Sequence, residues 1–325
     1  MNDIVASAKK LFLDSLSLFW TLLKIMVPVM VLVRAGQEIG LIDYLAKGLG
    51  PVMGIFGLPA EAALVLATGL LVGNYGAVAI LVTLLPGSEF SVADVTVLLS
   101  IILIAHNMPI EQSVARKAGL SALYSTGFRL IVGLSYGLAL HLFYSATNML
   151  QYPVDLSWLP FTPKLEETWV EWTLSSTSFL FSLFWIILGL IILLRAFEAL
   201  KITDFLSWLL SPLLRLMGIS KQATPITMIG VLLGIAYGGG LIIREAQKGK
   251  LSPKEVVLSM SFMCICHGLI EDPLIMVTFG AHWTAAFIGR FVFCVVVMII
   301  ICRVVQKLPE STFNRTFYRA PQLAT

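Results

Sequence analysis

Charged residues are scarce in this chain, and their scarcity excludes the commonest class of protein. Only 13% of the 325 residues are Asp, Glu, Lys or Arg, whereas a soluble globular domain carries about 25%. Hydrophobic residues make up 58%, and the mean hydropathy is +0.91. A surface with so little charge is not built for water on all sides, so a soluble domain is excluded.

Cysteines and nucleotide-binding motifs are also few or missing. The four cysteines all lie in apolar segments near the C-terminus, which argues against a disulfide framework. No GxxxxGK[ST] stretch occurs, so a P-loop nucleotidase is excluded. The stretch 133–137 matches a nucleophile elbow, but that motif needs a strand–turn–helix context and here lies in an apolar run. We therefore expect no enzyme activity, no cofactor and no resident metal.

The net charge of +3 is spread over segment ends rather than gathered in one patch, so no nucleic-acid partner is expected. Nothing at the N-terminus resembles a cleavable signal peptide, because an apolar run of full spanning length follows the first lysines without a small-residue cleavage site.

Long apolar runs are what the chain has in abundance. Stretches of roughly the 20 residues needed to span a bilayer recur along it, for example at 16–33, 62–85, 121–144, 178–194 and 287–302. Alternating strands of the barrel type are absent, so helices must satisfy the backbone within lipid. The sequence predicts an all-α integral membrane protein whose partner is the lipid bilayer.

The two halves of the chain resemble each other. A shift of 161 positions pairs glycines, prolines, histidines and arginines over a long span without a gap. Among the pairs are Arg34 with Arg195, Pro51 with Pro212, Gly69 with Gly230, Gly73 with Gly234, His106 with His267 and Arg129 with Arg290. Such residues seldom coincide by chance in an apolar background, so the chain contains an internal repeat.

Each half reads as five helical segments. A long helix (about 15–36; 177–197) precedes a short proline-containing piece (41–57; 202–218) and a glycine-rich helix (60–84; 223–244). A helix opened by a capping box follows, Ser91 with Asp94 and Ser252 with Glu255, and a last helix (121–145; 283–304) closes the unit. We assign residues 1–145 to the first repeat, 146–176 to an external linker, 177–306 to the second repeat and 307–325 to a cytoplasmic tail.

Lysine and arginine placement predicts how the repeats sit. The basic segments at Arg116 and Lys117, 244–254 and 303–319 are expected in the cytoplasm, whereas the acidic, aromatic linker is expected outside. Five crossings per half then give two inverted repeats with both termini cytoplasmic, in a bacterial inner membrane. The short pieces 41–57 and 202–218 are the alternative: either could be a re-entrant hairpin, which would change the parity. Broken or re-entrant helices at a repeat interface are typical of secondary transporters.

One motif pair carries the chemistry that we single out. His106, Asn107, Pro109 and Glu111 in the first half correspond to a second-half stretch containing His267, Gly268, Glu271, Asp272 and Pro273. Ionisable groups at membrane depth are expensive and usually face a cavity or one another. Proline frees backbone carbonyls that could coordinate a cation or solute, and histidine can carry a proton near neutral pH. We expect both motifs to bind substrate or ion.

Two further groups of residues are candidates. The glycine-rich segments contain Gly69, Gly73, Gly230 and Gly234 at a spacing that lets helices approach closely, and beside them Asn74, Tyr75 and Tyr237 could contact a solute. Arg129 and Arg290 could bind an anion, although arginines near helix ends commonly extend to the membrane surface instead.

At these motifs the sequence resembles the nucleoside-recognition Gate domain family, seen twice, at about 62–115 and 223–276. That family includes the gate segments of concentrative nucleoside transporters and of ferrous iron transporter B, and the spore maturation proteins A and B. The chain differs from the iron transporters in lacking their GTPase domain and a cysteine at the first gate motif, and it is shorter than the nucleoside transporters.

The resemblance implies a secondary transporter of a small polar, nucleoside-like solute, working as a homo-oligomer by symport with H⁺ or Na⁺. A divalent metal ion permease is one alternative, in which the same histidines and carboxylates would be ligands. A non-transporting membrane partner, or a lipid-handling protein in envelope assembly, is the other.

Overall fold

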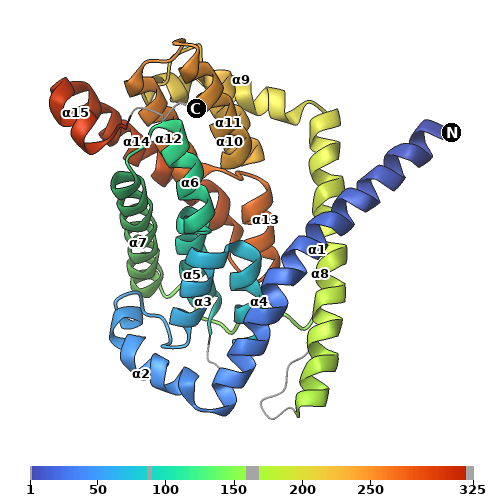
Figure 1. Ribbon diagram of the computed structural model, residues 1–325. Helices are drawn as coiled ribbons and strands as arrows, with labels where there is room; N and C mark the ends of the chain where they lie inside the picture. Colours follow the sequence, from blue (N-terminus) through green and yellow to red (C-terminus); the bar gives the residue numbers. More distant parts are fainter. Residues whose placement is uncertain (1, 86–89, 159–167, 320–325) are drawn as a thin grey trace.

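A computed structural model describes residues 2–85, 90–158 and 168–319 (Figure 1). These ranges form helices and no β-strand, only two isolated bridges. The helices of the first half are α1 (Asn2–Glu38), α2 (Leu41–Gly54), α3 (Ala62–Val72), α4 (Asn74–Leu84), α5 (Val92–Ala105), α6 (Met108–Ala118) and α7 (Ala122–Thr147). Those of the second half are α8 (Trp169–Ala199), α9 (Ile202–Leu216), α10 (Ala223–Leu233), α11 (Ile235–Gln247), α12 (Pro253–Cys266), α13 (Glu271–Thr278), a π-helix (Thr284–Gly289), α14 (Arg290–Lys307) and α15 (Glu310–Thr316).

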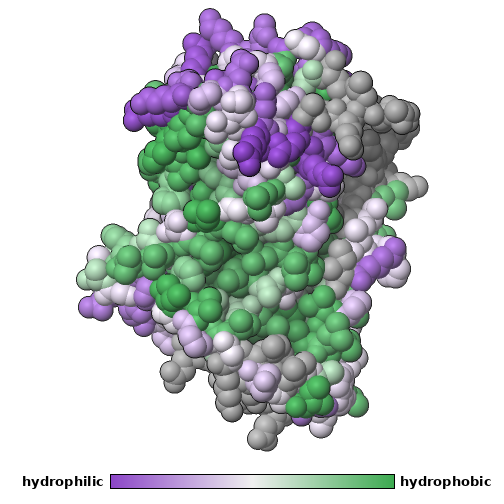
Figure 2. Space-filling model, turned by 60° about the vertical axis from the view of Figure 1, so that its left-hand side comes forward, coloured by the Kyte–Doolittle hydropathy of each residue, from purple (hydrophilic) through white to green (hydrophobic). Residues whose placement is uncertain are grey.

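Six helical segments in the described ranges are long and apolar enough to cross a membrane. They lie at Ser15–Glu38, Val92–Ala118, Ala122–Thr147, Trp169–Phe197, Pro253–Thr278 and Thr284–Lys307, three in each half. The molecular surface agrees with this reading: a hydrophobic band covers the middle of the face in Figure 2, and hydrophilic residues gather above it. The chain is a multi-pass α-helical membrane protein.

The glycine-rich segments are hairpins and not the single helices that we predicted. Gly73 and Gly234 interrupt them at φ of 113° and 106°, a conformation that favours glycine. Beyond each glycine the chain turns back: a Cβ on Gly238 in α11 would lie only 2.3 Å from the Cα of Gly230 in α10. Each 11-residue arm, α3, α4 or α10, is about 16 Å long, too short for a hydrocarbon core of about 30 Å.

The expected five crossings per half are therefore wrong, and three take their place. The hairpins α3–α4 and α10–α11 enter and leave on one side, while α2 and α9 are single helices of 14 and 15 residues at opposite ends of the molecule (Figure 1). The re-entrant element thus lies in the glycine-rich segment and not at 41–57 or 202–218. Three crossings per half, like five, are an odd number, so the second repeat would begin on the opposite side of the membrane from the first. The inverted arrangement of the repeats therefore stays a prediction.

Corresponding residues of the two halves make corresponding contacts. The capping boxes of Ser91 and Ser252 are both formed. A Cβ on Gly69 would meet Ile102, and one on Gly230 would meet Met263, which is 161 residues further along than Ile102. The internal repeat read from the sequence is thus also a repeat of local packing.

The halves interlock through their hairpins. In α11 Gly239 faces Val114 of α6, and in α4 the Tyr75 hydroxyl donates to Glu271 of α13 at 3.4 Å. The hairpin of each half therefore packs on the interrupted helix of the other half, α5–α6 or α12–α13. This exchange brings the two histidine motifs together.

Gly238→Ala should lower the free energy of unfolding by about 1–3 kcal/mol or more, because the added methyl group overlaps the backbone of the neighbouring hairpin arm. Gly240→Ala is the matched control in the same helix, since no atom lies within 4 Å of its Cβ position and alanine is the better helix former. Thermal unfolding of the purified proteins in detergent measures both. Equal midpoints for the two variants would contradict the hairpin.

Candidate functional site

Both histidines end an interrupted helix in the same backbone conformation. His106 follows α5 and His267 follows α12, each with extended φ and ψ (−72°, 164° and −81°, 171°). The next residue, Asn107 or Gly268, is left-handed in both halves (φ 48° and 56°). Glycine and asparagine are the residues that adopt this conformation most readily. The sequence thus breaks both helices at the same point.

The breaks leave backbone carbonyls that two buried arginines satisfy. Arg129 donates from Nε to the Ile104 carbonyl at 3.0 Å and from Nη2 to the His106 carbonyl at 2.8 Å. Arg290 donates from Nη2 to the His267 carbonyl at 2.8 Å. Both arginines are 0% exposed, so neither extends to the membrane surface. The arginines thus satisfy carbonyls at both breaks, and coordination of a cation or solute by a carbonyl that the prolines free stays a prediction.

The two histidine side chains meet at the centre of the molecule, together with Glu111. His106 Nε2 lies 3.1 Å from His267 Nε2, and Glu111 Oε1 lies 3.1 Å and 3.2 Å from those two nitrogens. All three residues are buried, at 4–6% exposure. The other oxygen of Glu111 pairs with Arg129 Nη1 at 2.7 Å. These four residues form the central cluster, which joins both repeats.

Hydrogen bonding fixes the tautomer of each ring. The Nδ1 atoms lie 3.1 Å from the Ile102 carbonyl (His106) and 2.8 Å from the Met263 carbonyl (His267). A carbonyl oxygen only accepts, so each Nδ1 carries a proton, and in a neutral imidazole Nε2 then presents a lone pair. Two nitrogen lone pairs and a carboxylate oxygen therefore face one another. Such an arrangement is stable only with a cation among them, either a shared proton or a metal ion.

A first-row metal ion fits the size of this triangle. Ligand atoms about 2.1 Å from one ion lie about 3.0 Å apart at right angles and about 3.4 Å apart in a tetrahedron. The three observed separations are 3.1, 3.1 and 3.2 Å. His106, Glu111 and His267 could therefore supply three ligands on one side of an ion.

The second-half carboxylates lie at the edge of the cluster. Asp272 Oδ2 is 3.7 Å from His106 Nε2, and its carboxylate packs against the Cα of Gly268, where a Cβ would lie 2.2 Å away. Glu271 accepts from Tyr75 at 3.4 Å. The side-chain oxygens of Asn74 and Asn107 are buried without a hydrogen-bond partner among the described residues. Asp272 thus brings a carboxylate of the second half to the central cluster.

The remaining predicted residues have structural positions. Gly69 and Gly230 pack against the interrupted helices, and Gly73 and Gly234 form the hairpin turns. Pro109 lies in the first turn of α6 and Pro273 in that of α13, where a missing N–H costs little. The side chain of Tyr237 lies outside the described residues.

One contact escaped the sequence analysis: the pairing of Arg129 with Glu111. From the sequence we expect the two arginines to bind an anion or to extend to the membrane surface. Their signal was present in the spacing, because each arginine lies 23 residues after the histidine whose carbonyl it binds.

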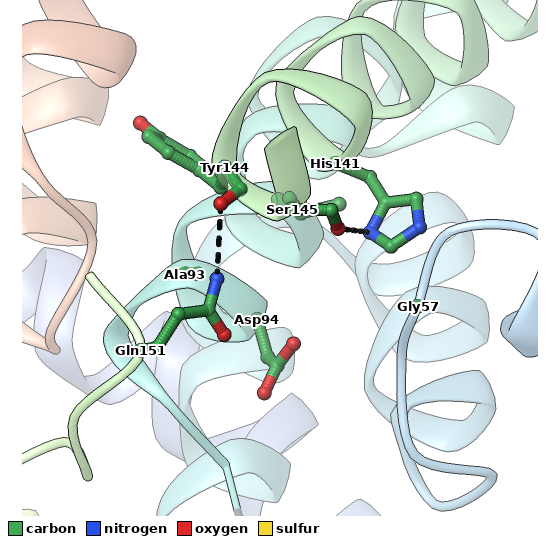
Figure 3. Close-up of a pocket in the computed structure, with 8 residues that line it drawn as sticks. Gly57, Ala93, Asp94, His141, Tyr144, Ser145 and Gln151 are labelled. Carbon is green, nitrogen blue, oxygen red and sulfur yellow. Dashed lines mark hydrogen bonds between the residues drawn. The ribbon is translucent and has the colours of Figure 1, made fainter. Parts of the chain in front are cut away.

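A cavity of about 100 Å³ lies elsewhere, at the N-terminal end of α5 (Figure 3). Its lining includes Gly57, Asp94, His141, Ser145 and Gln151, and none of the predicted site residues. Ser145 Oγ and His141 Nδ1 are 3.4 Å apart, and the His141 ring fills the space that a Cβ on Gly57 would need. We treat this cavity as a packing feature of α7 against the loop after α2.

Comparison with known proteins agrees with this architecture. Residues 19–121 match the model of the Gate family, described as nucleoside recognition, which confirms the resemblance for the first of the two predicted gate segments. The chain is 28% identical over 282 residues to the uncharacterized membrane protein YvoD of Bacillus subtilis (strain 168), covering 84% of this chain and 88% of that protein. No solved structure matches. The chain is a multi-pass membrane protein, and its residues 19–121 are similar to the Gate family, which is found in nucleoside transporters and related membrane proteins.

Arg129→Met should lower the free energy of unfolding by about 3–5 kcal/mol, because it leaves Glu111 buried without its counter-charge. The double variant Arg129→Met/Glu111→Met should recover part of that loss, since it removes both charges. Arg116→Ala, at an exposed position of α6, serves as the control and should change little. Thermal unfolding in one detergent checks all three, and a harmless Arg129→Met would show that the pair does not stabilise the fold.

Proposed function

We propose that this protein is a secondary transporter of a small polar solute, driven by a cation that binds at the central cluster. The observation that carries the proposal is the meeting of His106, His267 and Glu111, whose lone pairs face one another at 3.1–3.2 Å. A cation is the species that this arrangement binds, and it lies where the hairpins and interrupted helices of both halves meet. Ion-coupled carriers bind their coupling ions at such positions.

The surroundings of the cluster suit a polar solute. Asn74 and Asn107 offer amide groups, and Tyr75 and Glu271 offer a hydroxyl and a carboxylate. Hydrogen-bonding groups of both kinds at a buried position suit a molecule with several donors and acceptors. The family description, nucleoside recognition, favours a nucleoside-like solute. H⁺ is our preferred coupling ion and Na⁺ the other, in a plasma membrane with both termini cytoplasmic, and we expect a homo-oligomer.

A divalent metal permease is the second candidate, and the size of the triangle favours it. Two imidazole nitrogens and a carboxylate are ligands that suit zinc, iron or manganese. Their ligand atoms all lie within 4.8 Å of one another. In this case the metal ion is the substrate itself.

Protein in proteoliposomes should take up a nucleoside, or another small polar solute, when a pH gradient is imposed, and His106→Phe and His267→Phe should abolish the uptake. Phenylalanine keeps an aromatic ring at the position but removes the Nε2 lone pair that would bind the cation. His141→Phe is the control, because His141 lies at the cavity of Figure 3 and not at the cluster. Uptake from a panel of labelled nucleosides, nucleobases and organic anions measures the effect.

The same preparations separate the two candidates. A transported metal present at about 100 times its dissociation constant should stabilise the wild type by about 2.7 kcal/mol, and the two phenylalanine variants not at all. Metal-dependent stabilisation without solute uptake favours the permease. Neither metal binding nor uptake in the wild type would contradict both candidates.

A further inference from the structure

The two halves are unequal at their arginines. Arg129 uses all three guanidinium nitrogens, two on carbonyls and one on Glu111. Arg290, 161 residues later, uses only Nη2, at 2.8 Å from the His267 carbonyl and 3.5 Å from that of Ile265. Its Nε and Nη1 are buried and have no hydrogen-bond partner among the described residues. A 0% exposed guanidinium with two unbonded nitrogens is costly, and an anion relieves that cost.

The repeat identifies the anion. Glu111, which binds Arg129, corresponds to Asp272 in the second half. Asp272 does not pair with Arg290, however: its Oδ2 lies 3.7 Å from His106 Nε2, on the side of the histidines. Aspartate is one methylene shorter than glutamate, so it cannot bridge to its arginine from the backbone position that Glu111 occupies. The first half is therefore closed by an ion pair, whereas the second is not.

We propose that Arg290 and Asp272 form the matching ion pair in the opposite conformation of the transporter, and that the cation then binds to His106, His267 and Asp272. Glu111 leaves the histidines in that state. The protein thus has two cation sites that share the histidine pair, one completed by Glu111 and the other by Asp272. This inference rests on the proposed function, since it describes how the same cluster serves both sides of the membrane.

The local structure allows such an exchange. Asp272 lies in the first turn of α13, a helix of only eight residues that follows the break at Gly268. Arg290 follows directly on the π-helix Thr284–Gly289, and π-helical turns are frequent at functional sites because the backbone can shift register there. Two copies of one fold that exchange conformations are the means by which repeat-built carriers open to alternate sides.

Exchanging the two carboxylates tests the proposal without any ligand. In the double variant Glu111→Asp/Asp272→Glu, the longer side chain at position 272 should pair with Arg290. The shorter side chain at position 111 should no longer pair with Arg129. Spin labels at the exposed positions Leu71 in α3 and Leu233 in α10 report the separation of the hairpins. We expect one dominant distance in the wild type, a different dominant distance in the exchanged variant, and both in Asp272→Glu alone. An unchanged distribution in the exchanged variant would overturn the proposal.

The arginines give a second measurement that does not depend on the exchanged variant folding. Arg290→Met removes an uncompensated charge together with the hydrogen bond to the His267 carbonyl, whereas Arg129→Met removes two carbonyl hydrogen bonds and leaves Glu111 unpaired. The unfolding midpoint should therefore fall less in Arg290→Met than in Arg129→Met. Arg290→Met should also lose uptake while its cation binding at His106, His267 and Glu111 is retained. Equal falls in the midpoints of the two variants would overturn the proposal. Two outcomes separate the proposals. Absence of cation binding and uptake in the wild type, with the expected change of hairpin distance in the exchanged variant, would contradict the proposed function alone. Normal cation binding and uptake with an unchanged hairpin distance would contradict this inference alone.

Discussion

The ion pair between Arg129 and Glu111 is the interaction on which the centre of this molecule depends. Helices that break within a membrane leave carbonyls that no water can satisfy, and a carboxylate there needs a counter-charge. One guanidinium meets both needs, because it binds the carbonyls of Ile104 and His106 and also Glu111. The break therefore costs little, and the histidine at the end of α5 is held with its Nε2 toward the other half. The helix break and the arginine that stabilises it thus bring the two histidines and Glu111 together.

Much of this arrangement could be predicted from the sequence, because it depends on residues that are rare in apolar segments. Histidine, carboxylate and arginine side chains stand out among leucine and valine, and they recur 161 residues later, with Asp272 in the place of Glu111. This recurrence predicted that the two histidine motifs meet at one interface. The capping boxes of Ser91 and Ser252 could also be predicted, because the spacing of serine and carboxylate in this motif specifies its two reciprocal hydrogen bonds. Local chemistry and the repeat together predicted that the two histidine motifs meet, but not how the glycine-rich segments fold.

The hairpins could not be predicted, for a physical reason. An apolar run of about 22 residues with a glycine in the middle fits a straight crossing as well as a pair of 11-residue arms. The φ of Gly73 and Gly234 depends on whether the arms pack on each other, and that contact involves Gly230 and Gly238, eight residues apart. Hydropathy does not report such a contact. The sequence also did not predict that Arg129 has a carboxylate partner and Arg290 has none among the described residues. That difference depends on the length of the side chains of Glu111 and Asp272, not on their charge.

The helices α2 and α9 have a consequence for how the protein moves. Both are strongly two-sided, and they present large apolar side chains outward, among them Tyr44, Val52, Phe205 and Trp208. A helix of this kind lies at the boundary between lipid tails and headgroups, at a depth set by its apolar face. Each of these helices leads directly into a hairpin. The two hairpins are therefore attached to amphipathic helices at opposite ends of the molecule (Figure 1). An interfacial helix resists displacement along the membrane normal. The hairpins attached to such helices can therefore tilt more easily than they can move across the bilayer. If α2 and α9 lie at the two membrane boundaries, the distance between them follows the thickness of the bilayer. A thinner bilayer is then expected to press the hairpins toward the histidines between them.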